Sequence, residues 1–169
     1  MATFLIPESR KQFLLDNFVE YSFEQDEYGN DLEADKLLFD SIISPEEIFF
    51  LAQHCNWDDG ATIPQWIINS PLCTKAAALT IFWQSAPYEY MEYAFGTTIT
   101  KWKSVEIDRE QTNILNILHT LIAKFKATEF HRLSIKFDFS IWGGKLVVDD
   151  PLWTPPKEFF NSIAGVEVI

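Results

Sequence analysis

The spacing of apolar residues changes once along this chain, and that change constrains the fold more than any other feature. Up to about residue 127, apolar side chains recur every three or four residues, as expected for amphipathic helices. From residue 133 to residue 141 they alternate with polar side chains, which predicts a half-buried strand. Gly143-Gly144 then suits a type I′ turn, which predicts a hairpin over residues 133–148 with Ile141 facing Leu146 and Phe139 facing Val148. The sequence therefore predicts an α+β, mainly α fold: a single helical domain with a C-terminal β-hairpin.

The helices have recognisable boundaries. Residues 8–22 and 31–43 each carry apolar side chains on one broad face, and in the second segment these are Leu37, Leu38, Ile42 and Ile43. Ser44 is expected to cap a helix that begins at Pro45, with Glu47 completing a capping box. Thr74 is expected to cap a central buried helix. This central helix is predicted at 75–84. Further helical segments are predicted near 63–69, 87–95 and 108–127.

Length and composition favour one domain with an ordinary core. The 169 residues are expected to form a single domain, 1–169, with an acidic helical part (1–60), a helical core (44–96), the long helix (108–127) and the hairpin (133–148). No apolar run approaches the roughly 18 residues of a membrane span, and the N-terminus lacks the basic start of a signal peptide, so we expect a cytoplasmic protein. Cys55 and Cys73 are expected to be reduced, buried thiols.

The negative charge is concentrated in the first third of the chain. The formal net charge of −12 argues against binding to nucleic acid or to anionic membranes. Residues 1–60 carry 14 acidic side chains against Arg10, Lys11 and Lys36, and their densest part is the segment 24–35. This segment is either a solvated loop or a surface that attracts a basic protein. On the second reading, the expected partner-binding residues are Glu24, Asp26, Glu27, Tyr28, Asp31, Glu33 and Asp35.

The aromatic stretch around Pro87 has two readings as well. Not every ring between Tyr88 and Phe95 fits on one buried helix face. Tyr88 and Tyr90 are therefore either core-edge residues or partner contacts, because tyrosine combines a large apolar area with a polar tip.

The chain lacks the common signatures of catalytic or metal sites. His54, His119 and His131 are not at metal-ligand spacing, no C-x-x-C occurs, and the glycines form no phosphate-binding loop, so neither a metal nor a cofactor is expected. The nearest approach to an active site is the pair Asp58 and Asp59, with His54 close in sequence. The competing reading is structural: Asn56 suits a left-handed residue after a helix, an aspartate before Gly60 suits a turn or cap, and Trp57 covers the junction.

One stretch of the chain resembles a known family. The residues that carry the resemblance are Ser44-Pro45-Glu46-Glu47, Asn56-Trp57-Asp58-Asp59-Gly60, Ile63-Pro64, Ile67-Ile68-Asn69, Pro71, Cys73, Ala77-Ala78-Leu79 and Ile81-Phe82-Trp83. Over residues 44–90 they resemble the domain-of-unknown-function 4274 family of small bacterial proteins. The resemblance implies a bacterial, cytosolic protein and supplies no catalytic residue. The structural motif expected from the sequence comprises Ser44, Glu47, Asn56, Trp57, Asp58, Asp59, Gly60 and Pro64.

Three functions are consistent with these features. The first is a non-catalytic binding module, an immunity protein that neutralises a cognate bacterial toxin through a negative surface. The second is an adaptor or regulatory protein with another partner. The third is an enzyme that uses Asp58, Asp59 and His54.

Overall fold

The protein is mainly helical, with one small sheet. The computed structural model describes residues 2–23, 32–90, 109–143 and 157–169. The helices are α1 (Glu8–Phe18), α2 (Lys36–Asp40), α3 (Pro45–His54), α4 (Thr62–Asn69), α5 (Lys75–Gln84), α8 (Arg109–Ala127) and α9 (Ser140–Gly143). The 3₁₀ turns are η1 (Tyr21–Phe23), η2 (Trp57–Asp59), η3 (Pro87–Tyr90) and η4 (Lys157–Phe160), and the strands are β1 (Thr3–Phe4) and β2 (Glu167–Val168).

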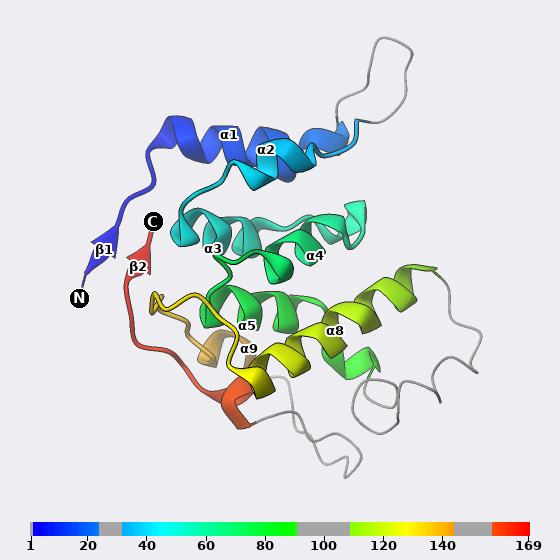
Figure 1. The fold of residues 1–169 in the computed structure, drawn as a ribbon, viewed down its shortest axis with the longest axis vertical. Helices are drawn as coiled ribbons and strands as arrows, with labels where there is room; N and C mark the ends of the chain where they lie inside the picture. The colour runs from blue at the N-terminus through cyan, green and yellow to red at the C-terminus, as the bar shows by residue number, and fades with distance from the viewer. Residues whose placement is uncertain (1, 24–31, 91–108, 144–156) are drawn as a thin grey trace.

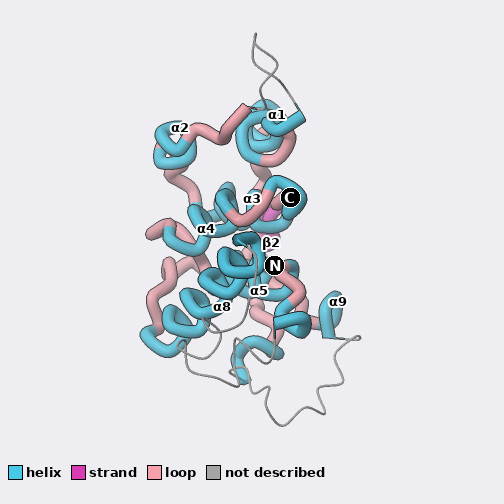
Figure 2. Tube along the Cα trace, turned by 90° about the vertical axis from the view of Figure 1, so that its right-hand side faces the viewer, coloured by secondary structure: helices cyan, strands magenta, loops and turns pink. Residues whose placement is uncertain are grey.

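The helices are arranged in successive layers. In both views α1 and α2 lie at one end, α3 and α4 come next, and α5 and α8 follow (Figures 1 and 2). The layers pack through contacts of α3 with α1 and α5, and of α4 with α5 and α8. β1 pairs with β2 in parallel, which brings the two ends of the chain side by side (Figure 1). Within the described ranges, no helix has both the length and the apolar character needed to cross a membrane.

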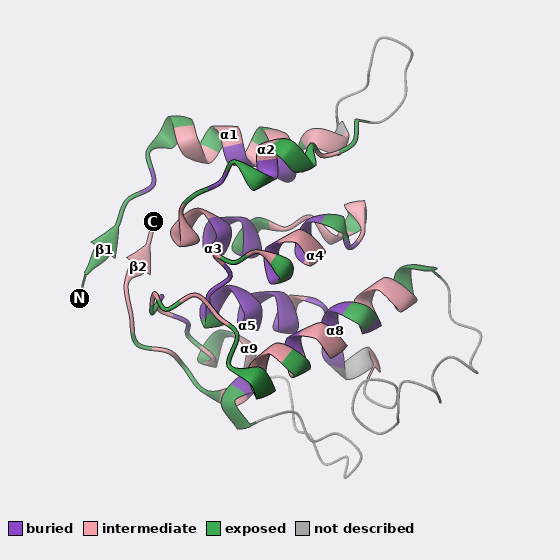
Figure 3. Ribbon diagram, viewed as in Figure 1, coloured by how far each residue is buried: buried purple, intermediate pink, exposed green. Residues whose placement is uncertain are grey.

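The central helix α5 forms the core, as its composition predicts. Every residue from Ala76 to Trp83 is buried, and the three consecutive alanines allow neighbouring helices to approach closely (Figure 3). The C-terminal segment is attached to this core by aromatic side chains. Phe159 packs edge-on against Phe82 and Phe125, with ring centroids 4.3 and 4.4 Å apart, and its carbonyl accepts a hydrogen bond from Trp83 Nε1.

The side chains of Thr74 and Ser44 cap their helices as predicted, but the predicted capping box between Ser44 and Glu47 does not form. Thr74 Oγ1 accepts from Ala77 N at 3.2 Å, and Ser44 Oγ accepts from Glu47 N at 3.4 Å. The Glu47 carboxylate, however, does not complete the capping box. It binds the Arg10 guanidinium through two bonds of 2.8 and 2.9 Å, because α1 packs against α3 and offers a charged, bidentate partner.

The first two predicted helices are shorter than their apolar patterns indicate. Helix α1 ends at Phe18, and the 3₁₀ turn η1 follows. Helix α2 occupies only residues 36–40 of the predicted 31–43, because Asp35 Oδ1 accepts from Leu37 N and fixes the helix start there. Leu37 and Ile43 are 80% and 87% exposed, so the prediction that both lie on a buried face was wrong.

The predicted strand is present only as isolated β-bridges. Ile135 and Phe137 are buried between exposed Ser134 and Asp138, and they bridge to Val166 and Ile163 of the C-terminal segment. The strand does not continue to Ile141, because Asp138 Oδ1 accepts from Ser140 N and begins the helical turn α9. The second strand of the predicted hairpin, with Leu146 and Val148, lies outside the described residues.

Candidate functional site

The Asn56–Gly60 motif forms a tight turn between α3 and α4. Asn56 adopts an extended conformation and caps η2 by accepting from Asp58 N at 3.2 Å, so the expectation that Asn56 is left-handed was wrong. The left-handed residue is Gly60, with φ of 82°. Trp57 covers the junction as expected, packing on the core while Nε1 donates to Gln84 Oε1 of α5.

Asp59 connects this turn to the N-terminal part of the chain. Its Oδ1 accepts from Ser22 Oγ at 2.6 Å, and its Oδ2 accepts from Asn56 Nδ2 at 3.0 Å. Neither aspartate caps α4, which begins after Ala61 without a side-chain cap. Asp58 has an exposed carboxylate with no ion pair to a described residue.

A hollow of about 500 Å³, which we call the acidic pocket, opens beside this turn. Three stretches distant in sequence line it: η1, the residues before α2, and the region from the turn into α4. The lining residues are Tyr21, Ser22, Leu32, Glu33, Ala34, Asp58, Asp59, Thr62 and Trp66. Aromatic rings and carboxylates therefore share one concave surface.

The electrostatics of the acidic pocket favour positive charge. Burial, reinforced by the negative charges of Asp59 and Glu33, raises the pKa of Tyr21, so this phenol remains neutral. The ammonium of Lys36 lies 5.5 Å from the Trp66 ring centroid and 5.5 Å from that of Phe39. The chain thus already holds one cation against an aromatic ring of this pocket.

The structure places the other predicted partner-binding residues as follows. Asp35 is exposed but serves as the cap of α2. Tyr90 is half-buried and packs on the core. The other predicted partner-binding residues lie outside the part of the chain that the structure describes: Glu24, Asp26, Glu27, Tyr28, Asp31 and the side chain of Tyr88.

Asp59 and His54, two of the three residues considered for acid–base chemistry, are held by other contacts. His54 stacks on Phe50, with its Nδ1 2.8 Å from the Phe50 carbonyl oxygen, and it is not among the described residues that line the acidic pocket. Cys55 and Cys73 are free thiols, and burial raises the pKa of both, that of Cys73 to about 12. Across the described ranges, no cluster of three His, Cys, Asp or Glu side chains has the geometry for a metal ion.

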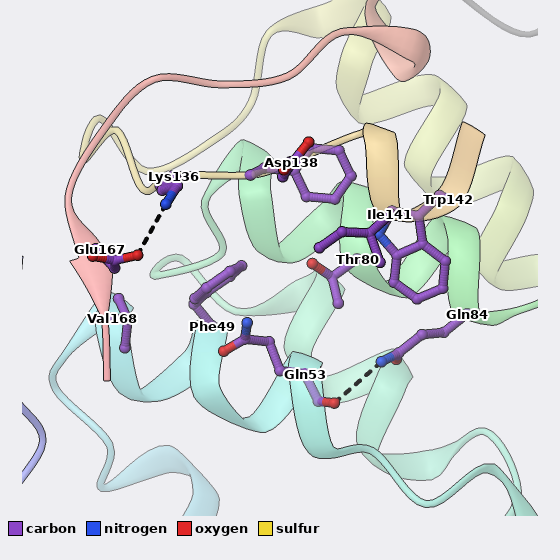
Figure 4. A pocket seen from close by; sticks show the side chains of 11 residues that line it. Phe49, Gln53, Thr80, Gln84, Lys136, Asp138, Ile141, Trp142, Glu167 and Val168 are labelled. Carbon is purple, nitrogen blue, oxygen red and sulfur yellow. Dashed lines mark hydrogen bonds and ion pairs between the residues drawn. The ribbon is translucent and has the colours of Figure 1, made fainter. Parts of the chain in front are cut away.

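A second hollow, of about 390 Å³, lies between α3, α5, α9 and β2, and the sequence did not predict it (Figure 4). Its apolar walls include Phe49, Ile141 and Trp142, and the paired charges Lys136 and Glu167 lie 2.9 Å apart at one side. Thr80 and Gln84 also line it. These two polar residues, four apart in a helix that is otherwise apolar after Lys75, were the available signal for it.

Comparison with known proteins gives one finding. No curated protein and no solved structure matches the chain. Residues 43–124 match the model of a family described as Domain of unknown function (DUF4274), a match that extends beyond the motif residues into α8. The chain therefore resembles the DUF4274 family over α3, α4, α5 and most of α8, as the Asn56–Gly60 motif and its flanking residues predicted.

Proposed function

We propose that the protein is a non-catalytic binding module, an immunity protein that neutralises a cognate bacterial toxin by covering a basic surface of that toxin. The observation that carries this proposal is the acidic pocket. It combines exposed carboxylates with aromatic walls in a concave site of the size that one or two side chains of a partner occupy.

A lysine or arginine side chain matches this pocket best. Its apolar stem would lie against Trp66 and Tyr21, and its charged end would reach Glu33 and Asp58. The contact of Lys36 with the Trp66 ring is an intramolecular example of the same pairing. Because Glu33 and Asp58 have no ion pair within the described part of the chain, a cation from a partner would not have to displace one there.

The position of the pocket in the chain adds to this argument. Leu32, Glu33 and Ala34 of its lining belong to the acidic segment 24–35. Segment and pocket together would present a negative surface to a positive partner, which accelerates association and aligns the two proteins. The bacterial origin implied by the family resemblance agrees with a toxin as that partner.

The proposal is tested by co-expression. If the gene immediately upstream encodes a toxin, co-expression of this protein should restore growth of cells that produce the toxin domain. The double variant Glu33→Lys/Asp58→Lys should lose this protection. The matched control Glu110→Lys/Glu158→Lys, which makes the same charge change at exposed positions outside the acidic pocket, should retain it. Equal protection by both variants, or none by the unmodified protein, would contradict the proposal.

A further inference from the structure

A third hollow is lined by basic side chains, in contrast to the acidic pocket. It has no part in the proposed function. We call this hollow of about 470 Å³ the basic pocket. Lys75, His131 and Arg132 line it together with the apolar side chains of Phe130, Leu133 and Ile163. No carboxylate is among its described lining residues, although the protein as a whole has a net charge of −12.

The fold brings the basic side chains together from two separate segments. His131 N donates to Cys73 O at 2.8 Å, which holds the segment after α8 against the start of α5. This contact brings Arg132 and Lys75, the first residue of α5, to the lining of the same hollow. Because α5 begins at the pocket, the positive end of its dipole adds to the field of the two side chains.

The basic groups of this pocket have spare hydrogen-bonding capacity. Lys75 and Arg132 are both exposed, and neither forms an ion pair with a described residue. His131 Nδ1 accepts from Leu133 N at 3.2 Å, which leaves Nε2 as the ring nitrogen that can donate to a ligand. Up to three donors of different geometry thus border one hollow: the planar guanidinium of Arg132, the ammonium of Lys75 and the ring N–H of His131.

We infer that the basic pocket binds a small phosphate monoester. A phosphate group supplies the concentrated negative charge and the several acceptor oxygens that Arg132 and Lys75 require. The pocket also has an apolar wall formed by Phe130, Leu133 and Ile163, and a bare inorganic ion would leave this wall unused. The ligand is therefore an ester whose organic part packs on that wall.

Calorimetric titration of the full chain with phenyl phosphate tests this inference. Binding should be saturable. The affinity should fall about tenfold in each of the single variants Lys75→Ala and Arg132→Ala, because each removes a charge-assisted hydrogen bond. Arg109→Ala is the matched control, since Arg109 is exposed and lies at the opposite end of α8, about 27 Å along the helix from the pocket.

Three results would overturn the inference. One is the absence of saturable binding, and another is an equal loss of affinity in all three variants. The third is equal affinity for inorganic phosphate, which would remove the assigned role of the apolar wall. Because all three substituted side chains are exposed, unchanged melting temperatures should accompany every measurement.

Discussion

Asp58 and Asp59 are neighbours in the chain, but their carboxylates have different surroundings. Asp59 accepts hydrogen bonds from Ser22 and Asn56 and so joins η1 to the Asn56–Gly60 turn. Asp58 points its carboxylate to solvent at the edge of the acidic pocket. At the scale of single residues, Asp59 stabilises the walls of the pocket and Asp58 contributes charge to it.

This difference predicts unequal effects on stability. Asp59→Ala should lower the free energy of unfolding by about 1–3 kcal/mol, because two partly buried donors lose their acceptor. Asp58→Ala should change it by less than about 0.5 kcal/mol. Urea denaturation of both variants measures these values. A stability loss as large for Asp58→Ala as for Asp59→Ala would show that the assignment is incorrect.

At the scale of elements, the buried cap of α5 is the contact most open to test. Thr74 and Thr80 are both buried in the same region, but Thr74 Oγ1 satisfies the N–H of Ala77, whereas the Thr80 hydroxyl donates to a helix carbonyl. Thr74→Val should therefore destabilise the protein by about 1–2 kcal/mol, and Thr80→Val by less. The two variants have the same change in shape, so comparable losses in thermal or urea unfolding would exclude capping as the cause.

The long helix α8 contributes a pH dependence through His119. Burial lowers the pKa of this imidazole below its ordinary value, so protonation favours the unfolded chain. The contribution of His119 is fully present above the unfolded pKa of about 6.5 and is lost as the pH falls from there towards the lower folded pKa. The drop in melting temperature between about pH 7.5 and pH 5.5 should thus be smaller in His119→Gln than in the unmodified protein. An equal drop would contradict this role.

The sequence predicted those elements whose signals are local. The caps at Ser44 and Thr74, the buried helix 75–84 and the alternation around Ile135 and Phe137 each depend on a few consecutive residues, and the structure confirms them. Glu47 was misassigned because its partner, Arg10, lies 37 positions away. Helix α2 and the turn α9 differ from prediction because Asp35 and Asp138 bind nearby backbone N–H groups, which outweighs the apolar pattern.

The candidate site was predictable only in part, because the residues that form it are distant in sequence. The motif residues Asp58 and Asp59 and the acidic residue Glu33 were all singled out from the sequence. Their meeting in one pocket depends on Ser22, whose hydroxyl reaches Asp59 across 37 positions, and on Tyr21 and Trp66, which no motif includes. Such tertiary contacts leave no spacing pattern in a single sequence.

At the scale of the whole molecule, the two pockets differ in the sign of their charge. The acidic pocket belongs largely to the first third of the chain, which carries 14 acidic side chains against three basic ones. The basic pocket belongs to the remaining part, where charges nearly balance. The DUF4274-like helices contribute to both pockets, because α4 supplies Trp66 and α5 supplies Lys75.

The most direct test of the proposed binding is its salt dependence, measured with a toxin domain as the partner if the gene immediately upstream encodes one. Calorimetry at about 50 mM and about 500 mM salt should show tight binding that weakens strongly at the higher concentration, because exposed charges are screened. Glu33→Lys/Asp58→Lys should weaken binding at least about tenfold at low salt, whereas Glu110→Lys/Glu158→Lys should leave it nearly unchanged. Affinity that is independent of salt and unaffected by Glu33→Lys/Asp58→Lys would contradict the account.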